Sequence, residues 1–369
     1  MLHAMRDADV IIMGGGIIGC ALAEELSRRG RRVTVVERGT VGAEASSAAA
    51  GILSAQMDVP RPGPFFDLCQ AARRAYPGWV RRLERASGVR VDYAARGVLY
   101  LAATRAQAER MTRRARWQQR AGLRVERWSP AEARRHEPSI DGRFVSGFHF
   151  PLEGEVDNVR LVHALAEACR RQGVRLVEHT TVQRILMRAG AVAGVETTRG
   201  RLAAPVVVNC LGSWAGLAPA APARAPVEPA RGQMVAFQAP KRLFHRPIMS
   251  DRAYIVQRKD GQVILGSTVE RVGFDKRLTV TGMHDILCGA RRMSSALESC
   301  SFLGAWTGLR PYSRTKAPVL GATRIPGLFV ATGHFRHGIL LAPTTAHAMA
   351  DLILRGRTRF DLSPFAPNT

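Results

Sequence analysis

The sequence predicts an α/β protein in which a doubly wound domain is intertwined with a second, α+β domain built on an antiparallel sheet. Three observations support this prediction. A glycine-rich turn joins a strand-like segment to a helix-like one near the N-terminus, within residues 11–26. Two further strand-like segments end in glycine loops, in the middle and near the end of the chain. Between them lie alternating apolar stretches that can pair as an antiparallel sheet: "RGVLYLAA", "MVAFQ", "AYIVQR" and "GQVILGST".

The first glycine turn has the pattern G-x-G-x-x-G, formed by Gly14, Gly16 and Gly19. A β-branched apolar run precedes it, apolar residues at helical spacing follow it, and a second strand-like run ends in Glu37. In a Rossmann-like unit these glycines allow a tight turn, the approach of a pyrophosphate and close helix packing, and the acid binds ribose hydroxyls. An ordinary structural turn would explain the glycines alone but not the whole unit. We therefore expect dinucleotide binding here.

The two later glycine loops extend this prediction. One follows the strand-like run within residues 205–216 and contains Gly212; the other spans residues 332–338, between a strand at 328–331 and a helix at 339–354. Loops at the carboxyl ends of strands in a doubly wound sheet gather at one edge, where ligands bind. The predicted division places residues 5–88, 150–222 and 303–369 in a discontinuous dinucleotide-binding domain. Residues 89–149 and 223–302 then form the substrate domain.

Small residues fill the stretch after Glu37, "RGTVGAEASSAAAGIL". Such a run supplies little core, but it suits backbone that must lie against a flat ring. This favours FAD over NAD, because FAD extends past the first βαβ unit; a flexible loop remains the alternative.

Composition excludes several classes of protein. No apolar run is long enough to span a membrane, and the N-terminus does not have the pattern of a signal peptide. The six cysteines are far apart, with no metal-ligand spacing, so we expect reduced thiols, no metal and a cytoplasmic protein.

The chain is strongly basic, with 54 Lys and Arg against 30 Asp and Glu and a formal net charge of +24. A basic surface attracts acidic substrates, nucleic acid or anionic membranes. The arginine-rich run "MTRRARWQQR" has helical spacing without aromatic residues suited to base stacking. We therefore expect a solvated basic surface and no nucleic-acid partner; a homo-oligomer is possible.

With these features in place, the sequence resembles the FAD-dependent glycine oxidases of thiamine biosynthesis, in the D-amino-acid oxidase superfamily. The resemblance covers nearly the whole chain. It rests on "GGGIIGCALAEEL", "SSAAAGIL", "EGEVDNVRLVHAL", "AYIVQRKDGQVILGSTVERVGFDKR", "WTGLRP" and "ATGHFRHGILLAP". It implies non-covalent FAD and oxidative deamination of glycine or a small amino acid to an imine or 2-oxo acid, ammonia and hydrogen peroxide, with oxygen as acceptor.

The resemblance also implies roles for individual residues. Arg310 and Tyr254 match the residues that hold the substrate carboxylate, Val269 matches a pocket position, and Arg336 lies in the loop around the flavin. Expected FAD contacts, together with the glycines above, are Ile17, Ile18, Glu37, Arg38, Ala45, Ser46, Ala50, Gly51, Ile52, Val182, His334, Phe335, Arg336, His337, Gly338, Ile339 and Leu340.

The chemistry supports these residue types. Arginine's planar fork binds a carboxylate bidentately, and a tyrosine hydroxyl adds a second hydrogen bond. Holding the substrate Cα next to the flavin converts the reaction into a near-attack arrangement. Without the motifs that surround them, Arg310 would be interpreted as a surface arginine and Tyr254 as a core residue of a strand. Three alternatives stay open: a dehydrogenase that passes electrons to a quinone or carrier, an oxidase acting on an aminomethyl group of nucleic acid, and a degenerate FAD-binding protein.

Three departures from the family pattern lie near the predicted substrate site. Residues 312–316, "YSRTK", replace a Gly-Thr pair and an acid; Arg252 replaces a small polar residue two positions before Tyr254; and His337 replaces an asparagine. If Arg252 shares a strand face with Tyr254, its guanidinium favours substrates with a second anionic group. Alternatively, Arg252 points into solvent, or pairs with Asp251 or Glu270.

Overall fold

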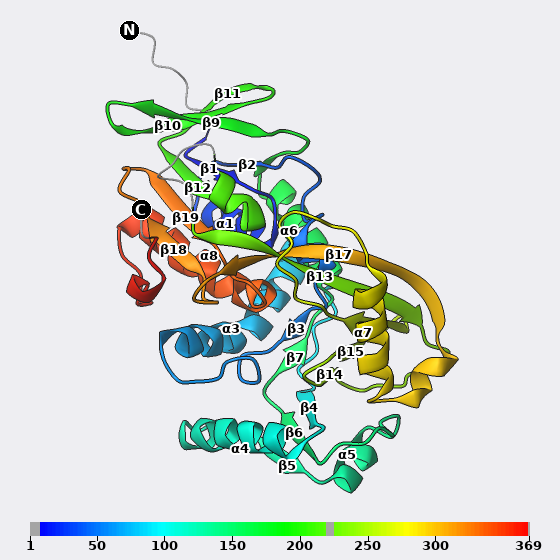
Figure 1. Ribbon diagram of the computed structural model, residues 1–369. Helices are drawn as coiled ribbons and strands as arrows, with labels where there is room; N and C mark the ends of the chain where they lie inside the picture. Colours follow the sequence, from blue (N-terminus) through cyan, green and yellow to red (C-terminus); the bar gives the residue numbers. More distant parts are fainter. Residues whose placement is uncertain (1–7, 219–224, 368–369) are drawn as a thin grey trace.

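The structure, a computed structural model, describes residues 8–218 and 225–367. Figure 1 shows two main β-sheets with helices around them, and the three-stranded sheet β9–β11 and helix α4 at opposite ends of the molecule. The predicted α/β class with a parallel and an antiparallel part is confirmed.

The first main sheet has six strands in the order β18-β19-β12-β1-β2-β8. All neighbours are parallel except β18 and β19, which are antiparallel. Every residue of β1 and β2 is buried, which explains why both read as uninterrupted apolar runs. The strands are β1 (Val10–Met13), β2 (Val33–Val36), β8 (Arg175–Val177), β12 (Val206–Asn209), β18 (Val319–Ala322) and β19 (Leu328–Thr332).

Alternate residues of this sheet face two different layers. Ile12 belongs to a core shared with helices, whereas its neighbour Ile11 belongs to a core shared with the three-stranded sheet. That small antiparallel sheet was not foreseen from the sequence. It has the order β11-β10-β9, formed by β9 (Val182–Arg188), β10 (Ala191–Thr197) and β11 (Gly200–Ala203).

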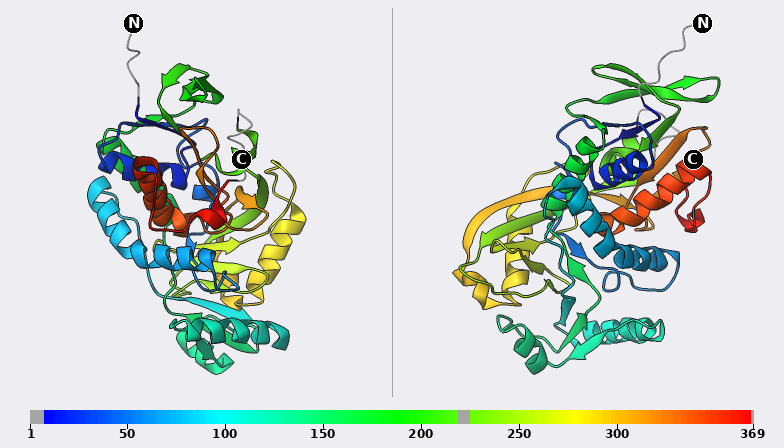
Figure 2. Two further views of the ribbon diagram at one scale, coloured as in Figure 1. Left: turned by 90° about the vertical axis from the view of Figure 1, so that its left-hand side faces the viewer. Right: turned by 180° about the vertical axis from the view of Figure 1, so that it is seen from behind.

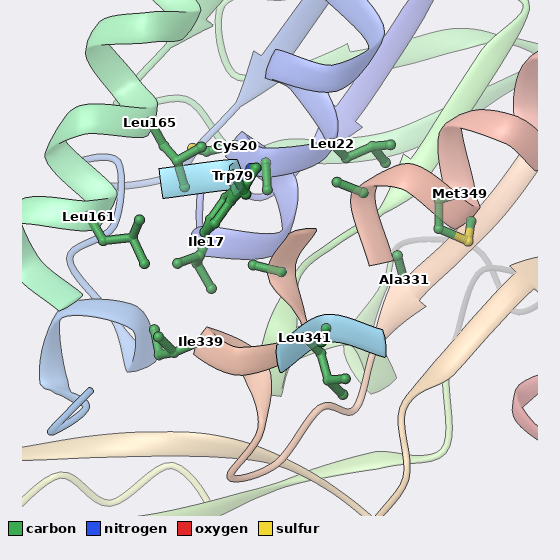
Figure 3. Packing of buried hydrophobic residues seen from close by; sticks show 14 of the residues in the cluster. Ile17, Cys20, Leu22, Trp79, Leu161, Leu165, Ala331, Ile339, Leu341 and Met349 are labelled. Atoms are coloured by element: carbon green, nitrogen blue, oxygen red, sulfur yellow. The ribbon is translucent and has the colours of Figure 1, made fainter. Parts of the chain in front are cut away.

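Four helices pack together on the other face of the parallel sheet. Figure 3 shows their common core, in which Ile17 and Cys20 of the first helix lie near Trp79, Leu161 and residues of the last helix. All the labelled side chains are buried. The helices are α1 (Ile17–Arg28), α3 (Pro64–Ser87), α6 (Asn158–Arg171) and α8 (Gly338–Arg355).

The second main sheet has eight strands in the order β17-β13-β16-β15-β14-β4-β6-β5, antiparallel except where β14 pairs with β4. Figure 2 shows α7 (Val280–Arg291) packed on this sheet and α4 (Arg105–Arg120) and α5 (Pro130–His136) at its far end. Its strands are β4 (Val98–Ala102), β5 (Glu126–Trp128), β6 (Ser146–Phe150), β13 (Val227–Gln238), β14 (Ile248–Met249), β15 (Tyr254–Gln257), β16 (Gln262–Gly266) and β17 (Ser301–Ser313).

The small-residue stretch after Glu37 packs against α6 and against β17 of the second sheet. It contains the short helix α2 (Ala45–Ala48) and leads into β3 (Ile52–Leu53), which pairs with β7 (Gly154–Glu155). The predicted domain limits stay a prediction. The limits at residues 5, 222 and 369 fall outside the described residues, β6 crosses the limit at 149/150 and β17 crosses the one at 302/303.

Candidate functional site

A single elongated cavity of about 430 Å³ runs from the glycine turn of β1 to strands β15 and β17 of the second sheet. Its walls come from both sheets, from the stretch after Glu37 and from the start of α8. Of the residues predicted to bind the cofactor or the substrate, most line this cavity: Gly14, Gly16, Ile17, Ile18, Glu37, Arg38, Ala45, Ser46, Ala50, Gly51, Ile52, Val182, Gly212, Tyr254, Arg310, His334, Phe335, Arg336, Gly338 and Ile339.

The glycine turn is as tight as its sequence predicts. Gly14 has a φ of +105°, and a Cβ at Gly19 would lie 2.0 Å from the Gly14 carbonyl oxygen. Gly19 does not line the cavity; it lets the first turn of α1 pack against the loop. Glu37 accepts hydrogen bonds from the Gly15 amide at 2.7 Å and the Gly39 amide at 2.9 Å. The carboxylate is thereby fixed at the end of β2.

Two helix N-termini border the cavity. The N-cap residues are Gly16 of α1 and His337 of α8, and neither provides a side-chain hydrogen bond to its helix. From outside the helix, the Ser46 hydroxyl accepts a hydrogen bond from the Ile17 amide at 2.9 Å. Both ends therefore present amide groups and a partial positive charge to the cavity. Such ends suit the pyrophosphate of a dinucleotide and the electron-rich edge of a reduced flavin.

We call residues 44–52 the wall segment, because eight of these nine residues line the cavity. Gly51 has a φ of +77°, and a Cβ there would lie 1.9 Å from the Val156 carbonyl oxygen. Opposite the segment, Gly308 of β17 approaches it closely, since a Cβ at Gly308 would lie 2.6 Å from the Ala48 Cβ. The small residues of this stretch therefore let two segments pack tightly beside the cavity, as required for a flat ring held against backbone.

Arg310, on β17, is the main cation at the other end of the cavity. Its Nη2 donates to the Ser267 hydroxyl at 2.6 Å and its Nη1 to the Thr268 carbonyl at 3.1 Å. Burial lowers the pKa of Arg310 from its ordinary value. No carboxylate among the described residues forms an ion pair with this guanidinium, so an anionic ligand would complete its coordination.

Tyr254 lies next to the same group. Burial raises the pKa of Tyr254, and the positive charge of Arg310 opposes that rise. A tyrosine of raised pKa keeps its proton at neutral pH and can donate a hydrogen bond. The structure thus brings together the two residues predicted to hold a carboxylate.

Four predicted contacts do not line the cavity: Gly19, Val269, His337 and Leu340. Val269, predicted at a pocket position, is 45% exposed and lies outside the cavity lining. The flanking residues explain why: Thr268 and Glu270 hydrogen-bond to β13, and alternation along the chain turns Val269 outward. Leu340 is buried in the helix core, and His337 is buried with its ring edge against Phe65.

Arg252 lines the cavity, but it does so from a turn and not from the strand that its spacing from Tyr254 predicts. It lies in the turn between β14 and β15, where its amide donates to the Ser250 hydroxyl at 3.3 Å, so the strand-alternation argument does not apply. Neither predicted ion-pair partner is available to it. Asp251 bonds Arg110 at 2.7 Å, and Glu270 pairs with Arg231. Among the described residues no ion pair is formed by the exposed Arg252 side chain.

Two contributors to the site escaped sequence reasoning. Gly232 makes room for Arg310, because a Cβ there would lie 2.1 Å from the Arg310 Nη1; only the register of β13 against β17 reveals this. Trp214 lines the opposite end of the cavity, where the Arg38 guanidinium lies 3.7 Å from its ring centroid and Phe274 stacks on it. An isolated tryptophan after a glycine loop carries no sequence signal for such a role.

Burial favours the uncharged form of His334, which lines the cavity, and of His337, which lies just outside it. Burial lowers the pKa of His334 to about 3 and also lowers the pKa of His337. His334 Nε2 lies 3.1 Å from the Thr345 hydroxyl. The described residues contain no cluster of three or more metal-ligating side chains, and no helix among them is long and apolar enough to cross a membrane.

The features of the cavity fit FAD. It offers glycine backbone and the N-terminus of α1 for the pyrophosphate, a fixed acid for the ribose, and a wall of small residues for the ring. Arg310 and Tyr254, the pair predicted to bind the substrate carboxylate, line the same cavity.

Comparisons with known proteins identify the family of the chain. The FAD dependent oxidoreductase family matches residues 9–352. The chain is 34% identical to the glycine oxidase of Geobacillus kaustophilus, covering 97% of this chain and 96% of that protein. It is 36% identical to the bifunctional protein ThiO/ThiG of Synechocystis sp., over 98% of this chain but only 54% of that longer protein. The crystal structure of the Geobacillus kaustophilus glycine oxidase superimposes with a TM-score of 0.93 over 98% of both chains. The chain is a member of the FAD-dependent oxidoreductase family.

Proposed function

We propose that this protein is an amino-acid oxidase that deaminates glycine or a similarly small amino acid and supplies thiamine (thiazole) biosynthesis. The observation that carries the proposal is the Arg310 guanidinium, which lies in the FAD cavity beside Tyr254 and lacks a carboxylate partner among the described residues. The similarity to glycine oxidases and to ThiO/ThiG supports the same substrate and pathway.

Each residue of the site then has a definable task. The Arg310 fork binds the substrate carboxylate, and Ser267 and the Thr268 carbonyl keep that fork oriented. The protonated Tyr254 hydroxyl donates a second hydrogen bond to the carboxylate. Bound FAD would supply the two-electron oxidation of the substrate Cα–N bond, with oxygen as the final electron acceptor and peroxide as its product. The remaining imine hydrolyses to a 2-oxo acid and ammonia.

No protein base is needed for this reaction once the substrate amine is neutral. His334 is uncharged, but its Nε2 is occupied by the Thr345 hydroxyl. The site residues therefore act by binding and orientation rather than by proton abstraction.

The experiment that tests the proposed function is anaerobic bleaching of the bound flavin by glycine, sarcosine, D-amino acids and acidic amino acids, followed by oxygen consumption. Bleaching by a small amino acid with stoichiometric peroxide on reoxidation supports an oxidase. Bleaching with slow oxygen uptake and fast transfer to a quinone would identify a dehydrogenase instead. Flavin that no amino acid bleaches would contradict the proposal.

Purified protein is expected to be yellow and to release its flavin on acid precipitation. Cys210 and His334, which line the cavity, are poorly suited to a covalent link. Burial raises the pKa of the Cys210 thiol, so the thiol stays protonated, and His334 is held by Thr345. The measurement is flavin absorbance in the supernatant against the pellet, with fluorescence of the denatured band as a control. Yellow colour confined to the pellet would show a covalent link.

Replacement of Arg252 by alanine tests substrate choice. Since Arg252 lines the cavity and forms no ion pair among the described residues, a second anionic group on the substrate would gain a charge pair there. We expect Arg252→Ala to lower kcat/KM for D-aspartate about 5-fold while changing that for glycine less than about 2-fold, because an exposed pair contributes up to roughly 1 kcal/mol. Steady-state kinetics on both substrates provide the comparison. Equal small effects on the two would leave glycine as the better substrate and remove Arg252 from the site.

A further inference from the structure

Arg258 is a buried guanidinium that lies behind the wall segment, on the side away from the cavity. It directly follows β15 and is 8% exposed, but it does not line the cavity itself. Among the described residues no carboxylate lies within ion-pair distance of it. A buried charge without an ionic partner is costly unless its donors are satisfied, so its hydrogen bonds show what it serves.

Those hydrogen bonds all go to neutral oxygens around the wall segment. Nη2 donates to the Ala50 carbonyl and to Asn158 Oδ1, both at 2.7 Å, and Nη1 donates to the Val156 carbonyl at 2.6 Å. The Val156 carbonyl is the oxygen against which Gly51 packs, and the Val156 amide donates to the Gly51 carbonyl at 2.9 Å. One guanidinium therefore joins the segment at Ala50 to the strand behind it.

Asn158 extends the same network to the other end of the segment. This residue is 1% exposed, and its side-chain amide donates to the Ser46 carbonyl at 2.8 Å and to the Ser47 carbonyl at 3.0 Å. Ser46 in turn accepts the Ile17 amide at the start of α1. Together, the side chains of Arg258 and Asn158 donate hydrogen bonds to three backbone carbonyls of the wall segment and to one behind it. These carbonyls belong to Ser46, Ser47, Ala50 and Val156.

Apart from the backbone hydrogen bonds of the short helix α2, the wall segment has few contacts that fix its shape, because alanine, serine and glycine offer little side chain. Ala48, Ala49, Ala50 and Gly51 all line the cavity and would determine where backbone meets the ring. The hydrogen bonds from Arg258 and Asn158 therefore help to fix the shape of this wall. We propose that Arg258 and Asn158 are positioning residues that set the wall segment against the flavin ring, and so control how tightly and in what environment the flavin is held.

This inference rests on FAD occupying the cavity, but not on the identity of the substrate. Its test uses Arg258→Lys and Arg258→Met in the purified holoenzyme, and measures the FAD Kd, the visible spectrum and the midpoint potential. Lysine keeps the positive charge, but its ammonium group lacks the planar fork of arginine and cannot reach the three oxygens that Arg258 binds. We expect the FAD Kd to rise roughly 10- to 100-fold in the methionine variant and less in the lysine variant, with shifted flavin bands in both.

Arg242→Met is the matched control. Arg242 Nη1 donates to the backbone carbonyl of Arg258 at 3.1 Å, but among the described residues Arg242 forms no hydrogen bond or ion pair with the wall segment. Its loss should leave the spectrum and the FAD Kd unchanged. Asn158→Ala should reproduce the spectral shift of Arg258→Met, and the double variant should show little further change because both act through one network.

Wild-type spectra, Kd and potential in both Arg258 variants would overturn the inference, even if their unfolding temperatures fell, because a purely structural role predicts that result. Equal spectral shifts in Arg242→Met would overturn it too. If Arg258→Met does not fold, the lysine variant alone decides. A wild-type enzyme that binds FAD but oxidises no amino acid would contradict the proposed function while leaving this test intact.

Discussion

Replacing Arg310 by alanine is expected to leave FAD bound and to lower kcat/KM for glycine by roughly 30- to 5,000-fold. Loss of a charge-assisted pair from a desolvated site costs about 2–5 kcal/mol, and each 1.4 kcal/mol is a factor of ten. FAD retention follows from the geometry, because the guanidinium bonds Ser267 and the Thr268 carbonyl and leaves the glycine turn untouched. Steady-state kinetics with flavin absorbance per protein measure both effects.

Two further variants separate charge from geometry. Arg310→Lys should recover only part of the loss, since an ammonium cannot form the bidentate pair. Arg324→Ala, which removes an exposed arginine outside the cavity, serves as the control and should match wild type. An unchanged kcat/KM in Arg310→Ala would contradict this prediction and would indicate that Arg336, which also lines the cavity, binds the carboxylate instead.

The parts of the site that the sequence predicts well are those built from contiguous residues. The turn of Gly14, Gly16 and Gly19 and the acid at Glu37 belong to one βαβ unit, so spacing alone brings them together. The wall segment is equally local. Its composition of small residues indicates close packing before any partner is known.

Parts that depend on pairing between distant strands could not be predicted in this way. Gly232 serves Arg310 only because β13 pairs with β17 in one register. The position of Val269 likewise depends on which of its neighbours turn toward β13. The spacing of Arg252 from Tyr254 predicts that both lie on one strand. In the structure β15 begins only at Tyr254, and Arg252 lies in the turn before it. A turn shifts the direction of one side chain without changing the hydrophobic pattern that the prediction used.

Gly19→Ala is the substitution with the largest expected effect on cofactor binding, because the glycine turn has no room for a side chain. The new Cβ would lie 2.0 Å from the Gly14 carbonyl oxygen and 3.3 Å from the Ile12 Cγ2. Neither neighbour can move easily. The Gly14 amide donates a hydrogen bond to the Val36 carbonyl at 2.8 Å, and Ile12 is fully buried in the middle of the parallel sheet.

We therefore expect Gly19→Ala to be isolated largely without flavin and to be destabilised by about 1–3 kcal/mol, the usual cost of forcing an extra methyl group into a packed site. The ratio of flavin to protein absorbance and the thermal unfolding midpoint with and without added FAD are the measurements. Because α1 must shift to admit the methyl group, its N-terminal amides leave the position that faces the pyrophosphate, and added FAD should restore little stability.

Gly78→Ala is the matched control, since Gly78 lies within α3 and a Cβ there meets nothing within 4 Å. In an open helical position this exchange should be neutral or stabilising by up to about 1 kcal/mol. A Gly19→Ala protein with the flavin content and unfolding midpoint of Gly78→Ala would show that the turn tolerates a side chain. The third glycine would then serve no packing purpose, and the dinucleotide reading of the turn would rest on Gly14, Gly16 and Glu37 alone.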